Sequence, residues 1–240
     1  MKALILAAGK GSRLKSETEN KPKALVEVKG KSILQYQLEA LSSCEIKDII
    51  IVIGYKGEEI KKFIERNKEK FKDLDVTFIE NKDYDKTNSA YSFFLARNEI
   101  NDNYIHLNCD IIFFPELLKA LINSKYENVI IIDKKVKLTS NMEQVIMNKD
   151  KIIKMRNTLL DGAIGKAVGL AKFSSKNIDW IKKRIEKYIN AGDKNQNYYG
   201  IIREAVEHLD FHGFDSQNKF VFEINSIGDL RLGRSLLNKP

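Results

Sequence analysis

A glycine-rich basic segment near the start of the chain is the first place where residue types and spacing favour chemistry. Residues 7–14 read Ala-Ala-Gly-Lys-Gly-Ser-Arg-Leu, and Lys23 follows ten residues after Arg13. Small residues let a backbone approach a polyphosphate closely, and backbone N–H groups in such a loop cradle anionic oxygens. Arg13 and Lys23 add the fixed positive charge that transfer at phosphorus needs as pyrophosphate leaves. The segment therefore predicts a polyphosphate site, with an ordinary strand-to-helix turn as the alternative.

Two common phosphate-binding motifs do not describe this segment. The Gly-x-Gly-x-x-Gly pattern of dinucleotide sites fails at Leu14, and the Gly-Lys-Ser/Thr of a Walker A loop is missing. The ligand must therefore be inferred from the rest of the chain.

Two acidic residues stand at the ends of apolar runs. Asp110 follows the run at residues 104–108, and Glu223 follows Phe-Val-Phe at residues 220–222. A carboxylate in such a place is costly unless it pairs or coordinates a cation. Together the two acids predict a Mg²⁺ site between phosphates. The alternative is that one of them caps a helix or pairs with a lysine.

Alternating strands and helices carry these residues in the first half of the chain. Such alternation implies βαβ units and an α/β fold with a Rossmann-like, doubly wound, mostly parallel sheet. Ligands bind beyond the carboxyl ends of such strands, so the glycine loop, Gly54-Tyr55, Asn81 and Asp110 are expected in one crevice. The predicted strands are 2–7, 49–53, 76–79 and 104–108, and the predicted helices start at Ser32, cover 60–71 and cover 89–98.

The second half of the chain is less regular. It shows no linker and no repeat, so we expect a single domain over residues 1–240 in which residues 115–240 extend residues 1–114 and close over the crevice. The predicted strands here are 129–132, 145–147, 168–173 and 220–224, and the predicted helices are 177–191, 198–209 and one capped by Ser226.

Composition narrows the class of protein. The chain has 240 residues, 43% hydrophobic and 31% charged, which suits one large folded domain. No apolar run approaches the roughly 18 residues of a membrane span, and the N-terminal apolar stretch lacks a cleavage-type close, so a cytoplasmic location is expected. Cys44 and Cys109 lack metal-type spacing and are expected to be reduced thiols. The net charge of +8 comes from lysines that alternate with glutamates, which favours solvated helix faces over a nucleic-acid groove, so no nucleic-acid partner is expected.

The assembled motifs carry a family resemblance. The chain resembles the nucleotidyltransferases that activate sugar phosphates and phosphocholine, and among these it is most similar to the bacterial phosphocholine cytidylyltransferases. The opening signature of that superfamily lies at residues 6–14 and 21–25, and supporting segments lie at residues 52–55, 88–93, 108–110 and 223–229. The resemblance covers almost the whole chain and is most specific at the N-terminus.

The resemblance implies a fold like that of the nucleotide-diphospho-sugar transferases, a nucleotide-binding half (1–114) and an acceptor-binding half (115–240). It also implies Mg²⁺-dependent transfer of a nucleotidyl group from a triphosphate, with CTP favoured, to a small phosphorylated or phosphonate acceptor. Pyrophosphate leaves, and the product is an activated headgroup for cell-surface, lipid or glycan decoration. The implied catalytic residues are Arg13, Lys23 and Asp110, the metal ligands are Asp110, Glu223 and Asn225, and the nucleotide-binding residues are Leu6, Ala7, Ala8, Gly9, Lys10, Gly11, Ser12, Asn81, Asn88 and Ser89.

Two departures from the family pattern affect the metal and the acceptor. The family reads Glu-x-Asp where this chain has Glu223-Ile224-Asn225, and an amide oxygen ligates Mg²⁺ without charge. The family also places an acid after an aromatic pair, whereas Tyr198-Tyr199 is followed here by Gly200, with Glu204 or Asp193 as other sources of an acid. We therefore expect that phosphocholine is not the preferred acceptor. The candidate acceptor residues are Tyr91, Arg156, Tyr198, Tyr199 and Arg203.

Three other functions remain open at this stage. A sugar-1-phosphate uridylyl-, thymidylyl- or guanylyltransferase would use the same residues, and Asn225 also fits an inactive nucleotide-binding regulator. A nucleic-acid-binding protein would show binding that falls steeply with salt. An attacking phosphate needs no general base, and His106, inside a predicted strand, is expected to be structural. The sequence does not indicate an oligomeric state.

Overall fold

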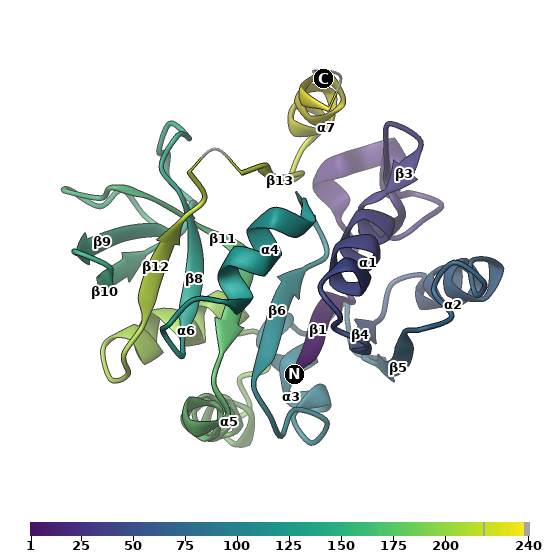
Figure 1. Cartoon of the computed structure of the whole chain (residues 1–240). Helices are drawn as coiled ribbons and strands as arrows, with labels where there is room; N and C mark the ends of the chain where they lie inside the picture. The colour runs from purple at the N-terminus through teal and green to yellow at the C-terminus, as the bar shows by residue number, and fades with distance from the viewer. Residues whose placement is uncertain (218, 238–240) are drawn as a thin grey trace.

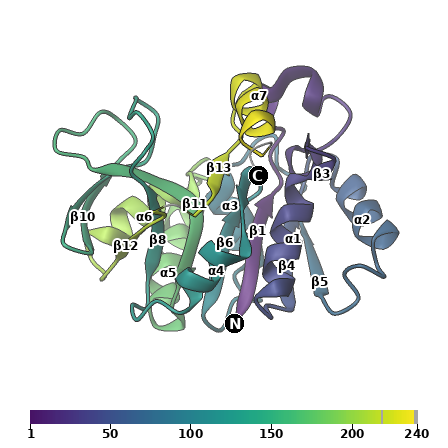
Figure 2. The same ribbon diagram turned by 45° about the horizontal axis from the view of Figure 1, so that its top comes forward.

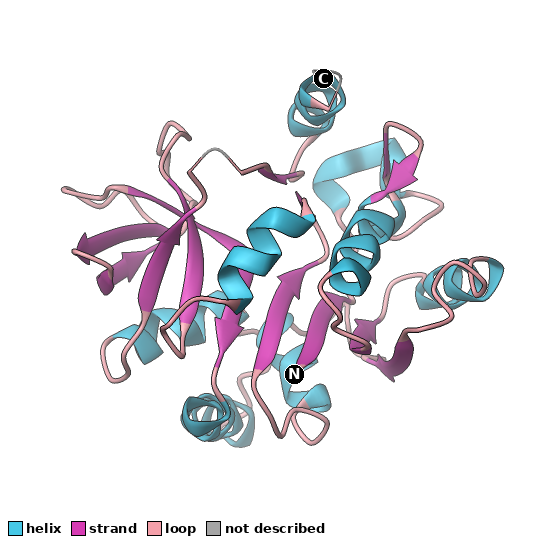
Figure 3. Ribbon diagram, in the orientation of Figure 1, coloured by secondary structure: helices cyan, strands magenta, loops and turns pink. Residues whose placement is uncertain are grey.

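The computed structural model describes residues 1–217 and 219–237, and a mixed sheet with helices on both faces fills its centre (Figures 1 and 3). Within these residues the sheet has nine strands, in the order β5-β4-β1-β6-β11-β8-β12-β10-β9. Their bounds are β1 (Lys2–Ala7), β4 (Asp48–Ile53), β5 (Asp75–Glu80), β6 (Tyr104–Asn108), β8 (Val129–Asp133), β9 (Gln144–Asn148), β10 (Lys151–Arg156), β11 (Gly165–Phe173) and β12 (His212–Asp215).

The parallel part of the sheet comes from the first half of the chain. β5, β4, β1 and β6 are parallel neighbours, and the four strands expected from apolar runs are confirmed to within one residue at either end. The connecting helices are α1 (Ile33–Ser43), α2 (Gly57–Arg66) and α3 (Ser89–Ala96). The expected helix start is confirmed, because the Ser32 hydroxyl accepts a hydrogen bond from the Gln35 backbone N–H and caps α1.

Each face of the parallel strands buries its own apolar core. Alternate residues of β1 point to opposite faces, so Leu4 and Leu6 join one core while Ala3 and Ile5 join the other. Helices α1, α2 and α4 (Pro115–Ile122) cover the second face, and α1 and α4 are in front of the sheet in Figure 1. Helices α3, α5 (Ser175–Asn190) and α6 (Tyr198–Val206) cover the first face. The sheet is therefore the middle of three layers.

The second half of the sheet departs from the expected parallel arrangement. β11 is antiparallel to β6, to β8 and to β9, whereas β8 and β12 are parallel. Because β9 pairs with β10 and β10 with β12, these five strands close into a ring of pairings beside the parallel sheet (Figure 2). The expected α/β class is confirmed, with the doubly wound parallel part limited to β5-β4-β1-β6.

Short strands and helices surround the carboxyl ends of the parallel strands. β7 (Ile111–Phe113) pairs antiparallel with β13 (Val221–Glu223), and β2 (Glu27–Val28) pairs with β3 (Lys31–Ser32). Two 3₁₀ helices, η1 (Ser12–Thr18) and η2 (Lys23–Leu25), follow β1, and α7 (Ile227–Leu236) packs against η1 and β2. No helix of the described chain is long and apolar enough to cross a membrane.

Candidate active site

The loop after β1 brings Arg13 and Lys23 to the carboxyl edge of the sheet. Gly11 has φ +65°, a left-handed conformation that glycine adopts without strain, and η1 begins directly after it. A side chain at position 11 would also be crowded, since its Cβ would lie 3.0 Å from the Cβ of Lys23. Gly11 therefore turns the chain tightly and lets the Lys23 stem pack beneath the loop.

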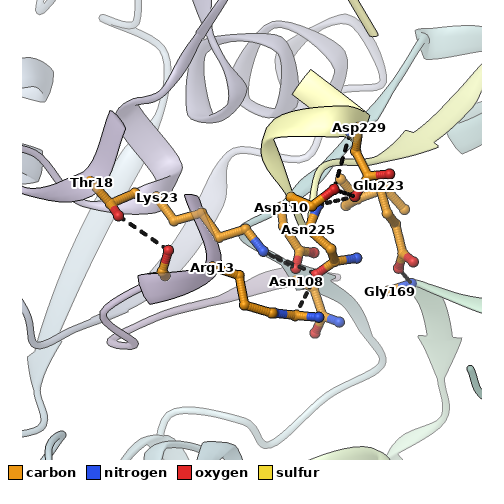
Figure 4. A network of polar contacts seen from close by, with 12 residues as sticks. Arg13, Thr18, Lys23, Asn108, Asp110, Gly169, Glu223, Asn225 and Asp229 are labelled. Carbon is orange, nitrogen blue, oxygen red and sulfur yellow. Dashed lines mark hydrogen bonds and ion pairs between the residues drawn. The ribbon is translucent and has the colours of Figure 1, made fainter. Parts of the chain in front are cut away.

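Both cations contact residues from distant parts of the chain (Figure 4). Lys23 is buried, and its Nζ donates to Asp110 Oδ2 at 2.7 Å and to Asn225 Oδ1 at 3.1 Å. Arg13 Nη2 donates to the same Asn225 oxygen at 2.8 Å. The expected charge cluster thus has a defined geometry, in which Lys23 bridges Asp110 and Asn225.

The pairing of β7 with β13 is what brings Asp110 beside Glu223 and Asn225. Glu223 is the register partner of Ile111, and the backbone N–H of Ile224 donates to the Asp110 carbonyl at 2.8 Å. The start of α7 fixes the next residue, because the Asn225 backbone N–H donates to Asp229 Oδ2 at 2.9 Å. The hydroxyl of Ser226 donates to the same carboxylate and accepts from the Asp229 N–H, which is the expected helix cap.

Glu223 is held by groups of β11. One of its carboxylate oxygens accepts from the Gly169 backbone N–H at 2.8 Å, and the other forms an ion pair with Lys166. Burial is the largest single influence and would lower the pKa of the Lys166 ammonium, but the charge and hydrogen bond of Glu223, together with the charges of Asp110 and Asp133, outweigh burial and raise that pKa. Lys166 therefore stays protonated next to the candidate metal ligands.

These oxygens suit a hard divalent cation. Asp110 Oδ1 is buried and has no hydrogen-bond partner in the described chain, although its side chain is 16% exposed overall. An unpartnered buried carboxylate oxygen is costly, so it calls for a cation or a bound water. Glu223 and the amide oxygen of Asn225 supply further oxygen ligands, which Mg²⁺ prefers. Among the described residues no three His, Cys, Asp or Glu side chains gather, so phosphate and water oxygens would complete such a site.

Two adjoining cavities open at this edge of the sheet, of about 340 Å³ and 240 Å³. The larger, the loop cavity, is bordered by the loop after β1 and the start of α3, and the smaller, the β11 cavity, by residues of β11 and those before β9. Their shared wall consists of Arg13, Asn108, Asp110, Asn197, Tyr199 and Asn225. Groups bound in the two cavities would therefore meet at Asp110 and Arg13.

Most of the residues expected to bind nucleotide line the loop cavity, together with Arg13, Lys23 and Asp110. Ala7 is buried under the loop instead, and Lys10 lies outside the lining, with its Nζ 5.8 Å from the centre of the Tyr84 ring. Asn81 is buried and donates to Thr87 and Ser92, so it organises the wall behind the cavity. The expected residues in the lining are Leu6, Ala8, Gly9, Gly11, Ser12, Asn81, Asn88 and Ser89.

The expected acceptor residues are brought together only in part. Tyr199 lines both cavities, and its hydroxyl donates to the Val168 carbonyl at 2.6 Å. Tyr198 is buried in the core, and Tyr91 packs against Phe94, away from both linings. Two arginines lie outside the linings and pair with acids: Arg156 with Glu207 and Arg203 with Glu143. Of the five, Tyr199 alone is in a position to contact a ligand directly.

Several lining residues were not expected from the sequence. Tyr84 and Thr87 belong to the polar stretch after β5, so their place behind a strand end was a usable signal. Glu143 and Lys166 gave no such signal, because one lies in an irregular stretch and the other alternates with apolar residues of β11. Asn108 was named only within the segment 108–110 that supports the family resemblance, and it lines both cavities.

His106 supports the site from inside the core. It is fully buried on β6, its ring stacks on Tyr198 at 4.5 Å, and its Nε2 is 3.1 Å from Asn108 Oδ1. Burial lowers the pKa of His106 from 6.5 to about 4, so the ring is neutral at physiological pH. The expected structural role agrees with this environment.

A basic glycine-containing loop, a lysine that bridges Asp110 and Asn225, and two cavities that meet at these residues suit a protein that handles nucleoside triphosphates. Residues 3–162 match the model of the MobA-like NTP transferase domain, and the chain belongs to this family. The protein is a nucleotidyltransferase.

Curated relatives and a solved structure agree with this assignment. The chain is 35% identical over 191 residues to the CTP:phosphoglutamine cytidylyltransferase of Campylobacter jejuni, covering 72% of this chain and 73% of the relative. It is 30% identical over 234 residues to the choline-phosphate cytidylyltransferase of Streptococcus pneumoniae, covering 96% of each. The structure of the CTP:phosphocholine cytidylyltransferase from Streptococcus pneumoniae superimposes with a TM-score of 0.82 at 26% identity over 99% of each chain.

Proposed function

We propose that the protein transfers a cytidylyl group from CTP to a small phosphorylated or phosphonate acceptor in a Mg²⁺-dependent reaction and releases pyrophosphate. The observation that carries the proposal is the shared wall of the two cavities, where Arg13, Asp110 and Asn225 face both. In this assignment the loop cavity holds the triphosphate and the β11 cavity holds the acceptor. The product would be an activated headgroup for decoration of a cell surface, a lipid or a glycan.

The reaction is an in-line displacement at the α-phosphorus. An oxygen of the acceptor phosphate or phosphonate forms the new P–O bond, and the bond to the β-phosphate breaks with its electron pair going to pyrophosphate. The attacking oxygen is already deprotonated at neutral pH, so no general base is needed, and positioning supplies much of the rate. Arg13 and Lys23 donate to the phosphates and stabilise the charge that grows on the leaving group.

The metal would be held by Asp110, Glu223 and Asn225. A bound Mg²⁺ would neutralise charge on the reacting phosphates and orient them. Lys23 and Arg13 now donate to the Asp110 and Asn225 oxygens, and a polyphosphate gives both cations other anionic partners. Asp110 Oδ1, buried without a partner in the described chain, supports this assignment most directly.

The choice of CTP rests on the relatives. Both curated relatives and the solved neighbour are named as cytidylyltransferases, one acting on phosphoglutamine and two on phosphocholine. Different acceptors among proteins with one donor suggest that the nucleotide side is shared while the acceptor side varies. We therefore assign the donor from the relatives and leave the acceptor to the chemistry of the β11 cavity.

A matrix of four nucleoside triphosphates against a panel of phosphorylated acceptors tests this function, with pyrophosphate release as the readout. We expect CTP to give the highest kcat/KM with the best acceptor, and turnover to stop when Mg²⁺ is chelated. A higher kcat/KM for UTP or dTTP with a sugar 1-phosphate would instead identify a sugar-activating enzyme. Nucleotide binding without pyrophosphate from any combination would identify a regulator.

A further inference from the structure

Glu143 is the acidic residue of the β11 cavity that lies away from the candidate metal ligands. Both of its carboxylate oxygens accept from Arg203 Nη1, at 2.6 Å and 2.9 Å. About one-fifth of each side chain is exposed (20% for Glu143 and 21% for Arg203). Arg203 therefore holds the carboxylate in one orientation, and because Glu143 lines the cavity, its oxygens can accept further hydrogen bonds from a ligand.

The position of Arg203 depends on Gly200, one turn earlier on α6. A Cβ at position 200 would lie 3.3 Å from Arg203 Nη2, so a larger side chain there would crowd the guanidinium. The resemblance places an acid at this position in related enzymes. In this chain the space beside Gly200 is occupied by the side chain of Arg203, and Arg203 binds Glu143 from the segment before β9.

Glu143, directly before β9, and Lys166, on the neighbouring strand β11, both line the cavity. The Glu143 carbonyl accepts from the Ala167 backbone N–H at 2.7 Å, and Lys166 is the register partner of Gln144. Lys166 pairs with Glu223, whose strand runs beside Asp110. The cavity is therefore polar from the reacting end at Asp110 to Glu143.

Glu204 and Asp193, the other acids that the sequence offers for the acceptor pocket, lie outside both cavities. Glu204 pairs with Arg184 and accepts from the Tyr188 hydroxyl at 2.7 Å, between α5 and α6. Asp193 accepts from Gln196 at 2.6 Å, in the turn before α6. Neither lines the two cavities, which leaves Glu143 as the acid beyond the metal ligands in the described lining.

The lining discriminates between kinds of ammonium group. A quaternary ammonium has no N–H and is held mainly by aromatic faces, whereas a primary ammonium donates hydrogen bonds to carboxylate oxygens. In the described lining of the β11 cavity Tyr199 is the one aromatic residue. Building on the proposed function, we propose that Glu143, positioned by Arg203, binds a primary ammonium group of the acceptor.

Steady-state kinetics with four acceptors tests the proposal. Phosphoethanolamine and 2-aminoethylphosphonate carry the primary ammonium, phosphocholine carries a quaternary one, and glycerol phosphate carries none. We expect the two primary amines to rank first in the wild type. In Glu143→Gln their kcat/KM should fall by about 10- to 100-fold, the effect of losing a charge-assisted hydrogen bond, while glycerol phosphate changes by less than about threefold.

Arg203 is a positioning residue, so its variants need a different readout. Arg203→Gln should raise KM for the primary amines more than it lowers kcat, and Arg203→Lys should restore part of that loss. Glu127→Gln is the matched control, because Glu127 is a surface acid that pairs with Lys176 at 2.8 Å and lines neither cavity. Its four kcat/KM values should equal those of the wild type.

Binding measured by calorimetry separates this proposal from the proposed function. Each acceptor is titrated into the protein with Mg²⁺ and a non-hydrolysable CTP analogue. Tighter binding of phosphoethanolamine than of phosphocholine, lost in Glu143→Gln, supports the subsite even if no acceptor is turned over. Preference for phosphocholine or glycerol phosphate, or an equal effect of Glu143→Gln on all four acceptors, overturns the subsite and leaves the nucleotidyl transfer assignment intact.

Discussion

The two carboxylate oxygens of Asp110 have different environments. One oxygen is neutralised by Lys23 at 2.7 Å, and the other is buried without a partner in the described chain. We expect Asp110→Asn to lose about two orders of magnitude in kcat/KM, because a ligand charge at the metal disappears while the side chain keeps its shape. Urea unfolding should show that the variant is folded. Near-normal turnover would remove Asp110 from the reacting centre.

Asn225 is one of the two residues at which this chain departs from the family pattern, and its oxygen accepts from both Arg13 and Lys23. A carboxylate at this position would keep both contacts and add a negative charge beside the metal. We therefore expect Asn225→Asp to remain active and to reach half-maximal turnover at a lower Mg²⁺ concentration. A Mg²⁺ titration of turnover measures this. An unchanged midpoint would place Asn225 outside the metal's coordination sphere.

At the scale of elements, β6 carries a buried histidine whose charge state depends on folding. The pKa of His106 is about 4 in the folded protein and 6.5 without burial. Between these values the unfolded chain takes up a proton that the folded chain does not, so the stability linked to His106 is complete above about pH 6.5 and is lost as the pH falls towards 4. The loss of stability at the low end of this pH range is on the order of 3 kcal/mol.

We expect His106→Gln to remove this part of the pH dependence. Free energies of unfolding in urea at about pH 7 and about pH 4.5 measure it, and the difference between the two pH values should be smaller in the variant than in the wild type. An exposed histidine provides the comparison, through His208→Gln. If both variants kept the wild-type difference, a proton on His106 would not be costly in the folded state.

How far sequence could predict each element depended on how its residues are buried. β1 and β4 are buried along nearly their whole length and read as unbroken apolar runs, so they and the loop after β1 were predictable. β10 escaped prediction because a register irregularity between Ile152 and Lys154 breaks its alternation. β12 is half-buried along its length and carries no apolar pattern.

The residues of the candidate site also differ in how far the sequence could predict them. Arg13 and Lys23 belong to two segments that lie close together in sequence, residues 6–14 and 21–25, so their place in one cavity could be predicted. Glu143 enters the β11 cavity only because β9 pairs with β11, which is a tertiary contact between strands of opposite direction. Such a contact produces no periodic pattern of residue types that could be recognised in the sequence. Arg203 was expected near the acceptor from its helix, but its function through Glu143 required the structure.

At the scale of the whole molecule, the two halves of the chain are joined where the chemistry is expected. Arg13 and Lys23 come from the first turns after β1, Asp110 from the end of β6, and Asn225 from the start of α7. The turn before α6 is also tied to α3, since Asn88 N–H donates to the Lys194 carbonyl at 3.1 Å. A ligand that spans the two cavities would therefore contact residues from both halves of the chain.

The antiparallel pair β7–β13 has a consequence for the synthesis of the protein. Asp110 is translated before the middle of the chain, whereas Glu223 and Asn225 belong to its last eighteen residues. A premature stop codon upstream of β13 would leave the phosphate loop and the parallel strands encoded but would delete two of the three candidate metal ligands and the partner strand of β7. A frameshift between β7 and β13 should therefore be as damaging to activity as one before Arg13.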